Sequence, residues 1–460
     1  MLVALACAVG AVLLFAGVRP GATRAAGTGT QPAGVDTPLW SPRRIPTFLA
    51  REVETSAQDQ AAFTLTKQLS SIVAPAQACV AVDGPVGALA RVGGNVALAP
   101  ASTLKLLTAT TAIDRLGPTH RFTTNVVSDA AGDLVVIGGG DPLLATPEHI
   151  AYEHGQLRFR DAPVTPLAGL ADAIVASGVH DVTGALLVDD HVHDPLRFLP
   201  AWKPIYAQEG DVGSLGGLAV DGGYTAPNDT DAAADPALTT GQRLATLLAA
   251  RGVTIARGVR RGTAGASAHD VAHVDSPPLS AIVGEMLTSS DNYTAETLLR
   301  DIAVTSAGGA PATTAAGIAI VEHQIAALGV PTTGLVMHDG SGLAPADRVT
   351  CETMLHVIAL SSQPKFAAVN AGLPIAARTG TLVARFIGGP LAGKLRAKTG
   401  SIAGVVGLVG VIDGPDDLHF AFLANGDFSE DAGSDLQTQV ADAIGSTPDL
   451  QAPANLVPPP

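Results

Sequence analysis

Three short segments carry side chains suited to acyl transfer, and they follow one another along the chain. A serine hydroxyl is a poor nucleophile until an adjacent base takes its proton. Positions i and i+3 share one face of a helix, so a lysine three residues after a serine can reach it. Burial and the positive helix N-terminus both disfavour an ammonium ion. We therefore predict Ser102 as a nucleophile and Lys105 as its base. The segments are Ser102-Thr-Leu-Lys105, Ser290-Asp-Asn292 and Lys398-Thr399-Gly400-Ser401.

A second Ser-x-x-Lys match, Ser362 with Lys365, serves as an internal control. Pro364 lies between the two residues and would interrupt the helical turn that has to join their side chains. Lysine occurs at only six positions of the chain, and two of them complete the ordered trio. Arg378-Thr-Gly imitates the third segment, but only Lys398 leads into a long apolar strand pattern, so we expect Arg378 in a turn.

The second and third segments offer groups that could hold a substrate. Ser276 and the two prolines after it predict a helix start, which leaves Ser290 in a loop before a further helix over 295–300. Thr399 and Ser401 lie on one face of a predicted strand and can both donate to a carboxylate beside Lys398. Gly400 between them lets a substrate backbone approach. Taken alone, each segment also fits ordinary capping or solvated strand residues.

The elements that must position these residues follow from apolar periodicity. Apolar residues recur at three and four positions between Pro100 and Gly117, which predicts a helix with Ser102 in its first turn. Residues 394–412 and 418–426 predict adjacent antiparallel strands joined by Asp413-Gly414. Three further segments combine an apolar helix, a closing glycine and a strand, and indicate a mixed α and β protein. These segments are 171–190, 243–259 and 318–339.

The amino-acid composition limits the kinds of partner that the protein can bind. The 460 residues are 47% hydrophobic, which suits two or three domains, and the net charge of −15 disfavours nucleic acid and anionic membrane surfaces. We interpret the ligand-rich run 189–194, together with His269 and His273, as solvated loop side chains, so no metal or other cofactor is expected. Cys79 and Cys351 are expected to be buried free thiols, with one bridge after export as the alternative.

The two ends of the chain have a different composition. Residues 1–18 form an uncharged apolar run followed by Arg19 and small residues, a pattern typical of an export signal. We predict a signal peptide or membrane anchor over 1–26, and leave open cleavage near Ala25 and an uncleaved membrane tether. Residues 27–49 are expected to be a flexible linker and 447–460 a disordered tail.

With these residues in place, the chain resembles D-alanyl-D-alanine peptidases of the penicillin-binding protein 4 type, peptidase family S13. The ordered trio is the signature of penicillin-binding proteins and class A β-lactamases. Further similarity lies in 132–144, 276–300 and 338–350, and the resemblance covers most of residues 50–445. One departure is Ala344, where family members often have serine.

The resemblance implies a fold of the α/β (α+β) class. A transpeptidase/β-lactamase-like catalytic domain, with an antiparallel sheet flanked by helices, would comprise 50–118 and 276–446. An inserted α/β region over 119–275 would interrupt it. The long stretch between Ser102 and Ser290 agrees with such an insert, because connections within one compact domain are short.

The resemblance also implies a role for each site residue. Ser102 would be the acylated nucleophile and Lys105 its base, and Ser290 would relay a proton to the leaving group. Asn292 would bind the substrate amide, Lys398 would supply positive charge, and the backbone N–H groups of Ser102 and Ser401 would form an oxyanion hole. The implied protein is an extracytoplasmic serine-type D-Ala-D-Ala carboxypeptidase, secreted, periplasmic or cell-wall associated, with endopeptidase action left open. Its partners would be peptidoglycan stem peptides and, as covalent inhibitors, β-lactams.

Three other functions are compatible with parts of the sequence but fit it less well than the peptidase. Class A β-lactamases use a glutamate in a Glu-x-x-Leu-Asn loop, and the chain has no Leu-Asn pair. Esterases of the Ser-x-x-Lys type usually carry Tyr-x-Asn at the second segment, and the chain has no such match. A non-enzymatic peptidoglycan-binding protein would be expected to lack the nucleophile or the base, and both are present. The peptidase therefore ranks first.

Overall fold

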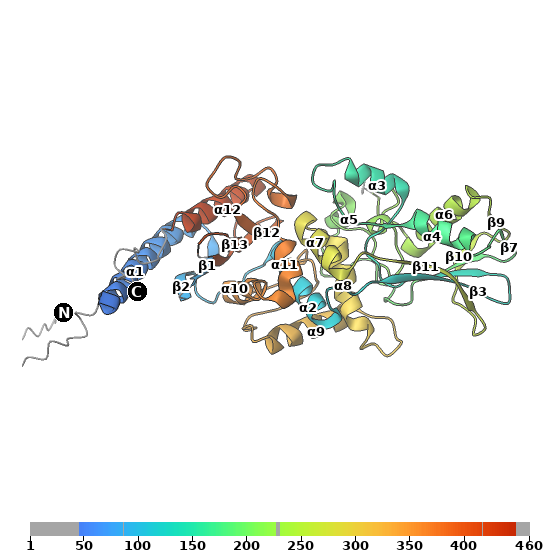
Figure 1. Cartoon of the computed structure of the whole chain (residues 1–460), viewed down its shortest axis with the longest axis horizontal. Coiled ribbons are helices and arrows are strands. Elements are labelled where there is room, and N and C mark those ends of the chain that lie inside the picture. The colour runs from blue at the N-terminus through green and yellow to red at the C-terminus, as the bar shows by residue number, and fades with distance from the viewer. Residues whose placement is uncertain (1–45, 86, 227–230, 416, 448–460) are drawn as a thin grey trace, which may run out of the picture. The chain divides into compact units, whose positions relative to one another are not determined.

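The computed structural model describes residues 46–85, 87–226, 231–415 and 417–447 (Figure 1). The described residues from 52 onward belong to one compact unit. The predicted signal or anchor over 1–26 lies outside the described residues, as do most of the predicted linker and tail. Helix α1 (Pro46–Val73) begins inside the stretch that was predicted to be a flexible linker. Among the helices of the described residues, none is both long and apolar enough to cross a membrane.

A five-stranded antiparallel sheet lies beside the predicted chemistry. Its order is β12-β13-β14-β1-β2. The predicted hairpin is confirmed, because Ile412 pairs with Leu418 across the Asp413-Gly414 turn. The run predicted over 394–412 is two strands, since Gly404, at φ 74°, turns the chain between them. The strands are β1 (Gln77–Gly84), β2 (Gly87–Val92), β12 (Leu395–Ile402), β13 (Val405–Ile412) and β14 (Leu418–Asn425).

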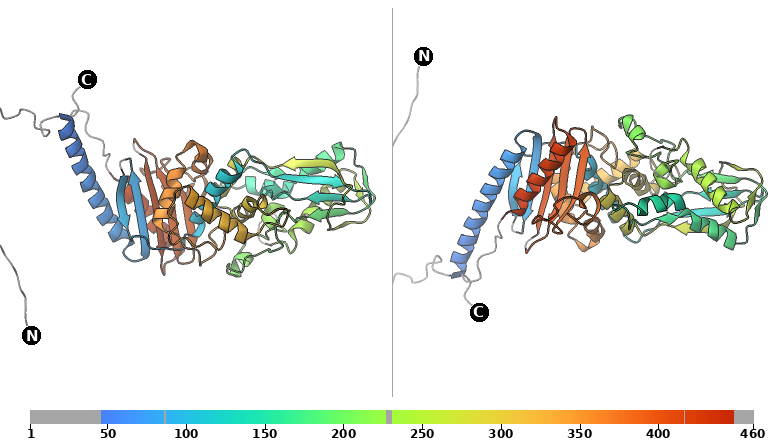
Figure 2. Two further views of the ribbon diagram at one scale, coloured as in Figure 1. Left: turned by 90° about the horizontal axis from the view of Figure 1, so that it is seen from below. Right: turned by 90° about the horizontal axis from the view of Figure 1, so that it is seen from above.

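Helices cover both faces of this sheet (Figure 2). Alternate strand residues point to opposite faces, so Phe420 and Phe422 pack against α12 (Glu430–Gly445) and the end of α1. Ala421 and Leu423 belong to the core on the other face. The helices of that second core are α2 (Lys105–Leu116), α7 (Leu279–Ser289), α8 (Asn292–Val304), α9 (Thr314–Ala327), α10 (Cys351–Leu360) and α11 (Ala367–Ala371).

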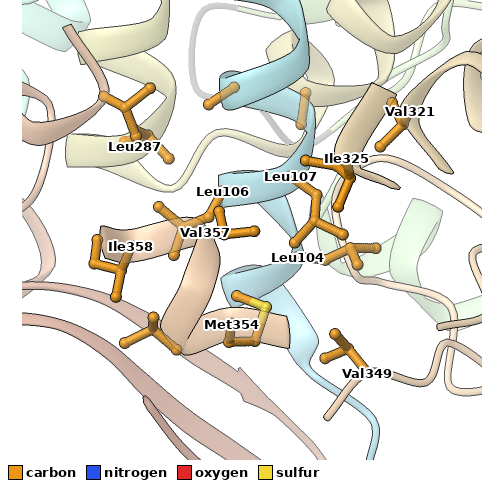
Figure 3. Close-up of a cluster of buried hydrophobic side chains, with 14 of the residues drawn as sticks. Leu104, Leu106, Leu107, Leu287, Val321, Ile325, Val349, Met354, Val357 and Ile358 are labelled. Carbon is orange, nitrogen blue, oxygen red and sulfur yellow. The ribbon is translucent and has the colours of Figure 1, made fainter. Parts of the chain in front are cut away.

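Helix α2 runs through the middle of the second core. The helix predicted after Pro100 is confirmed: a 3-10 turn, η2 (Ala101–Leu104), leads into α2, and Gly117 ends it with a φ of 86°. Leu106 and Leu107 are fully buried. Figure 3 shows them among Ile325 of α9 and Val357 of α10. Full burial of each such leucine contributes about 1.5–3 kcal/mol, so the helix that carries Ser102 is firmly held.

A second sheet is built entirely from residues of the predicted insert. Its order is β10-β8-β4-β3-β11, with β10, β8 and β4 parallel and the other two strands antiparallel. Helices α4 (Leu167–Ala176) and α6 (Pro236–Ala249) supply its main core, and α3 (Pro147–His154) and α5 (Ile205–Glu209) lie elsewhere in the same segment. The strands are β3 (Thr123–Ser128), β4 (Leu134–Ile137), β8 (Leu186–Asp189), β10 (Val259–Arg261) and β11 (His269–Asp275).

Two of the three predicted helix–glycine–strand units are confirmed and one is wrong. α4 and α6 are each followed by a glycine of positive φ, Gly178 and Gly252, and then by short strands. α9 also ends at such a glycine, Gly329, but 332–339 forms no strand beyond a single bridge between Val336 and Arg348. Within this stretch the His338 N–H donates to the Asp347 carboxylate at 2.7 Å, so it is not available to a sheet.

Two further expectations need correction. Ser276 does not cap a helix: α7 starts at Leu279, while the Ser276 hydroxyl accepts from the Phe122 N–H at 2.9 Å and donates to the Pro277 carbonyl. Cys79 and Cys351 are joined in a disulfide, with their Cα atoms 5.9 Å apart, rather than being free thiols. The bridge ties β1 to the first residue of α10 inside the core.

Candidate active site

Ser102 stands on a strained turn at the entrance to α2. The preceding Ala101 has a φ of 47°, which non-glycine residues rarely adopt. Gly342 packs so closely on this turn that a Cβ there would lie 1.9 Å from the Ala101 carbonyl oxygen. Such strain persists only where the surrounding structure enforces it. The turn that presents the Ser102 hydroxyl is therefore held from two sides, by α2 and by the loop around Gly342.

Lys105 is fully buried directly behind Ser102. Its Nζ donates to three acceptors: Ser102 Oγ at 2.9 Å, Asn292 Oδ1 at 2.6 Å and the Ser341 carbonyl at 2.8 Å. Burial lowers the pKa of Lys105 to about 8, although the charges of Asp291, Asp339 and Glu296 raise it. When this amine loses a proton, two N–H groups remain for Asn292 and Ser341, and the lone pair can face Ser102.

Ser290 and Asn292 lie at the junction of two helices. Ser290 ends α7 in the left-handed region, at φ 65°. Asp291 starts α8 by accepting the Thr294 N–H. Asn292 therefore stands at the first turn of α8, where its Oδ1 accepts from Lys105 and its Nδ2 donates to the Asp211 carbonyl at 2.7 Å.

Lys398 forms a second lysine–serine pair opposite the first. Its Nζ donates to Ser290 Oγ at 2.7 Å and to the Thr399 carbonyl at 2.8 Å, and the side chain is fully buried. Burial lowers the pKa of Lys398 well below its usual value, and the charges of Lys105 and Arg158 lower it further. The predicted residues thus form two networks, Ser102–Lys105–Asn292 and Ser290–Lys398.

The remaining predicted residues follow Lys398 along β12. The Thr399 hydroxyl donates to Thr381 Oγ1 at 2.9 Å, and Ser401 is exposed. A Cβ on Gly400 would lie 2.6 Å from the Pro100 carbonyl oxygen, so this glycine lets the strand approach the nucleophile's own turn. That close contact is a reason for glycine that the sequence analysis did not give.

A cavity of about 880 Å³ opens at Ser102. Asn292 and Ser401 line it from the catalytic side. Lys203, Tyr206 and Asp211 line it from the insert, just before, on and just after α5. The cavity places the candidate nucleophile beside space for an extended ligand, and the insert supplies one of its walls.

Sequence comparison identifies the family. The model of the "D-Ala-D-Ala carboxypeptidase 3 (S13) family" matches residues 86–234 and 228–445. The chain belongs to this family. A carboxypeptidase of Mycobacterium tuberculosis is 33% identical over 447 residues, covering 90% of this chain and 91% of the relative. The D-alanyl-D-alanine carboxypeptidase of Actinomadura is 28% identical over 446 residues, covering 78% and 79%.

The fold comparison agrees with this membership. Penicillin-binding protein 4 of Haemophilus influenzae has a TM-score of 0.68 at 20% identity, over 82% of this chain and 98% of that protein. The resemblance on which the sequence analysis relied is therefore confirmed, and so are the fold class and the enzyme class, a D-Ala-D-Ala carboxypeptidase hydrolase.

Sequence reasoning missed the loop that braces the carboxypeptidase site. Glu296 accepts the N–H groups of Gly340 and Ser341, while Asp339 accepts those of Gly342 and Ala344. The indole of Trp202, from the insert, also donates to Asp339 at 2.8 Å. The signal was the two closely spaced glycines in Asp-Gly-Ser-Gly-Leu, which indicate close backbone contact but do not name the partner.

The residues that sequence reasoning set aside lie apart from these networks. Ser362 shares a hydrogen bond with His419, and Lys365 pairs with Asp114. Arg378 lies in a turn, as predicted. The run 189–194 was predicted to be solvated, and this is wrong for His193, which is buried and whose ring bonds to Asp301. Asp190 of the same run pairs with Arg197 and Arg261.

Proposed function

We propose that this chain is a serine-type D-Ala-D-Ala carboxypeptidase that cleaves peptidoglycan stem peptides through an acyl-enzyme at Ser102. The observation that carries the proposal is the 2.9 Å contact between Ser102 Oγ and the fully buried Lys105 amine. With a pKa of about 8, about a tenth of the Lys105 amines are neutral at pH 7 and able to accept a proton.

Acylation begins when neutral Lys105 takes the Ser102 proton. The Ser102 oxygen then bonds to the carbonyl carbon of the penultimate D-alanine. The backbone N–H groups of Ser102 and Ser401 stabilise the negative oxygen that forms, in the manner of an oxyanion hole. Asn292, fixed by Lys105 and the Asp211 carbonyl, presents its side-chain amide to the substrate backbone.

Departure of the terminal D-alanine requires a proton on its nitrogen. Ser290 relays to this nitrogen the proton that Lys105 took from Ser102, which leaves Lys105 neutral again, and a hydrogen bond donated by Lys398 orients the Ser290 hydroxyl. The carbon–nitrogen bond breaks and the acyl group stays on Ser102. Water then attacks the ester while Lys105 accepts the proton of the water. The bond between the acyl carbon and Ser102 Oγ breaks, Lys105 returns the proton to Ser102, and the shortened peptide leaves. A β-lactam acylates the same serine, but its leaving nitrogen stays attached to the acyl group.

The substrate's terminal carboxylate is held by hydroxyls of β12. Thr399 and Ser401 stand beside Lys398, which makes the field there positive. A peptide ending in free D-Ala-D-Ala should therefore be cleaved much faster than its C-terminal amide. Replacing both residues, as Thr399→Val with Ser401→Ala, should lower activity on the acid, with about 1.5–3 kcal/mol per charge-assisted bond as an upper guide. Equal rates for acid and amide in the unmodified enzyme would refute this carboxylate site.

Two features support the division into a catalytic domain and an insert. The strands of the β12-β13-β14-β1-β2 sheet all come from 50–118 and 276–446, and those of the β10-β8-β4-β3-β11 sheet all come from 119–275. Removal of the insert should spare acylation by a small β-lactam if the catalytic domain still folds. Complete loss of labelling in a folded truncated protein would contradict the division.

The enzyme acts outside the cytoplasm, where its family's peptidoglycan substrate lies. The Cys79–Cys351 bridge fits this location, because disulfides form and persist in oxidising compartments. Export through the apolar segment at residues 1–18 is part of the proposal. Mass measurement of the mature protein decides between cleavage near Ala25 and a retained anchor.

A further inference from the structure

A second cavity, of about 600 Å³, shares no lining residue with the cavity that contains Ser102. Three arginines line it: Arg158 and Arg160 from the turn after α3, and Arg378 from the turn before η5 (Gly380–Leu382). We call it the arginine pocket. Several other arginines of the described residues pair with carboxylates: Arg91, Arg197, Arg261, Arg300 and Arg396.

The three arginines of the pocket differ from these arginines in their ion pairs and hydrogen bonds. Within the described residues, none of the three guanidinium groups makes an ion pair or a hydrogen bond. Burial lowers the pKa of Arg158, yet a guanidinium stays protonated at every physiological pH. All three arginines are exposed, and Arg158 stacks on the Phe159 ring and lies near Glu285 and Asp291. In a chain of net charge −15, such a cluster indicates a site for an anion.

The pocket adjoins the groups that handle the leaving nitrogen. Ser289, one of its lining residues, precedes Ser290, the hydroxyl that Lys398 holds. Thr379 and Gly380, on another wall, precede Thr381, which accepts from Thr399. The Arg158 charge also reaches both active-site lysines, because it lowers the pKa of Lys105 and of Lys398. The Ser102 cavity is instead lined by the end of β12, from Ser401, and by the start of β13, to Val406.

The wall of the pocket that carries Arg378 is held in place by close packing. A Cβ on Gly380 would lie 2.1 Å from the Thr288 carbonyl oxygen, so this turn packs directly on the last turn of α7. The Arg378 guanidinium lies flat against Gly393, where a Cβ would approach it to 2.6 Å. Two glycines at positive φ therefore fix the position of this charge.

The two acidic residues that line the pocket do not prevent an anion from binding there. Asp161 is exposed at the rim. Glu285 is the other acid of the lining, and burial and the neighbouring Asp291 raise its pKa to about 8. Glu285 is therefore mostly neutral at pH 7 and does not repel a carboxylate.

From this geometry we propose that the arginine pocket binds a carboxylate on the leaving part of the substrate, beyond the carboxylate held at Thr399 and Ser401. A cavity of about 600 Å³ is far larger than one alanine, which has only six non-hydrogen atoms. It has the size of pockets that enclose ligands of several hundred daltons. The leaving part that fits is the stem peptide of a cross-linked substrate, which carries further carboxylates. This inference rests on the proposed function and adds a specificity-determining site to it.

The test compares two substrates on the intact enzyme and on Arg160→Gln, Arg378→Gln and the double variant. Cleavage of a cross-linked stem-peptide dimer should fall about tenfold or more in kcat/KM for the double variant, because charge-assisted hydrogen bonds are lost. Release of D-alanine from a monomeric pentapeptide and penicillin labelling should stay unchanged. Arg257→Gln is the matched control, since this exposed insert arginine also lacks a partner and its replacement removes the same charge.

A chemically modified dimer completes the experiment. When the carboxylates of its leaving stem are amidated, the unmodified enzyme should cleave it as slowly as the double variant cleaves the acid. Equal losses on dimer and pentapeptide would overturn the inference, as would unchanged cleavage of the dimer. An unmodified enzyme that releases D-alanine but never cleaves the dimer would also overturn it and leave the proposed function intact. Failure to release D-alanine at all would instead refute the proposed function.

Discussion

Two Ser-x-x-Lys segments of this chain have the same spacing but differ in their backbone structure and in the burial of the lysine. At Ser102 the segment spans a 3-10 turn that leads into α2, so the hydroxyl and the Lys105 amine meet at 2.9 Å. At Ser362 the helix α10 has already ended at Leu360, and Pro364 starts a new short turn. Ser362 and Lys365 then take separate partners, His419 and Asp114.

The difference lies in burial as well as in geometry. Lys105 is fully buried, and burial lowers its pKa to about 8, whereas the Lys365 side chain is half exposed beside a carboxylate. A motif therefore becomes a candidate catalytic pair only when the backbone joins its two side chains and the core removes water from the lysine. Helix continuity and desolvation can each be tested.

The largest effect is expected from Lys105→Arg. Arginine keeps the positive charge but does not give up its proton, so no base remains for Ser102. Acylation by penicillin should slow by about 10²–10⁴-fold, the range typical of a lost general base. Stopped-flow labelling measures the rate, and circular dichroism verifies folding. Lys365→Arg, the matched change in the other segment, should leave the rate unaltered. A near-normal rate in Lys105→Arg would mean that another group acts as base.

A smaller effect is expected from pH. The pKa of Lys105 is lowered from 10.5 to about 8, and only the deprotonated amine can accept the Ser102 proton. The acylation rate should therefore rise as pH rises through about 8, by about tenfold between pH 7 and pH 9, and then level off. Rate measurements on the unmodified enzyme test this dependence, and Lys365→Arg should not shift the curve. A flat profile over this range would contradict the role of Lys105.

The smallest of these effects is expected from Gly342→Ala. The added Cβ would press on the Ala101 carbonyl from 1.9 Å and displace the strained turn that presents Ser102. We expect acylation to slow and the free energy of unfolding to fall by about 1–3 kcal/mol. Denaturant titration measures the second quantity. Gly329→Ala is the control: it too has a positive φ but open space around it, so it should lose stability without a comparable loss of acylation.

Sequence patterns predicted the helices and turns that are determined by neighbouring residues. The apolar period after Pro100 gave the helix that carries Ser102, and Asp413-Gly414 gave the β13–β14 hairpin. Pro364 correctly separated the second Ser-x-x-Lys segment from the first, because a proline acts on its own turn.

Contacts between distant segments were beyond this reasoning. The Asp211 carbonyl, which accepts a hydrogen bond from Asn292 Nδ2, belongs to the insert. The sequence around neither residue indicates this contact. Cys79 and Cys351 are 272 residues apart in sequence, and the expectation of free thiols failed because composition does not tell which cysteines meet. The strand expected after Gly329 does not form: Val336 makes a single bridge to Arg348, and the His338 N–H bonds to the Asp347 carboxylate.

The most direct test is to map the residue that a fluorescent penicillin acylates. The labelled peptide should contain Ser102, Ser102→Ala should abolish labelling while the protein stays folded, and Ser362→Ala should label normally. Label found on Ser362, or retained by folded Ser102→Ala, would contradict the account.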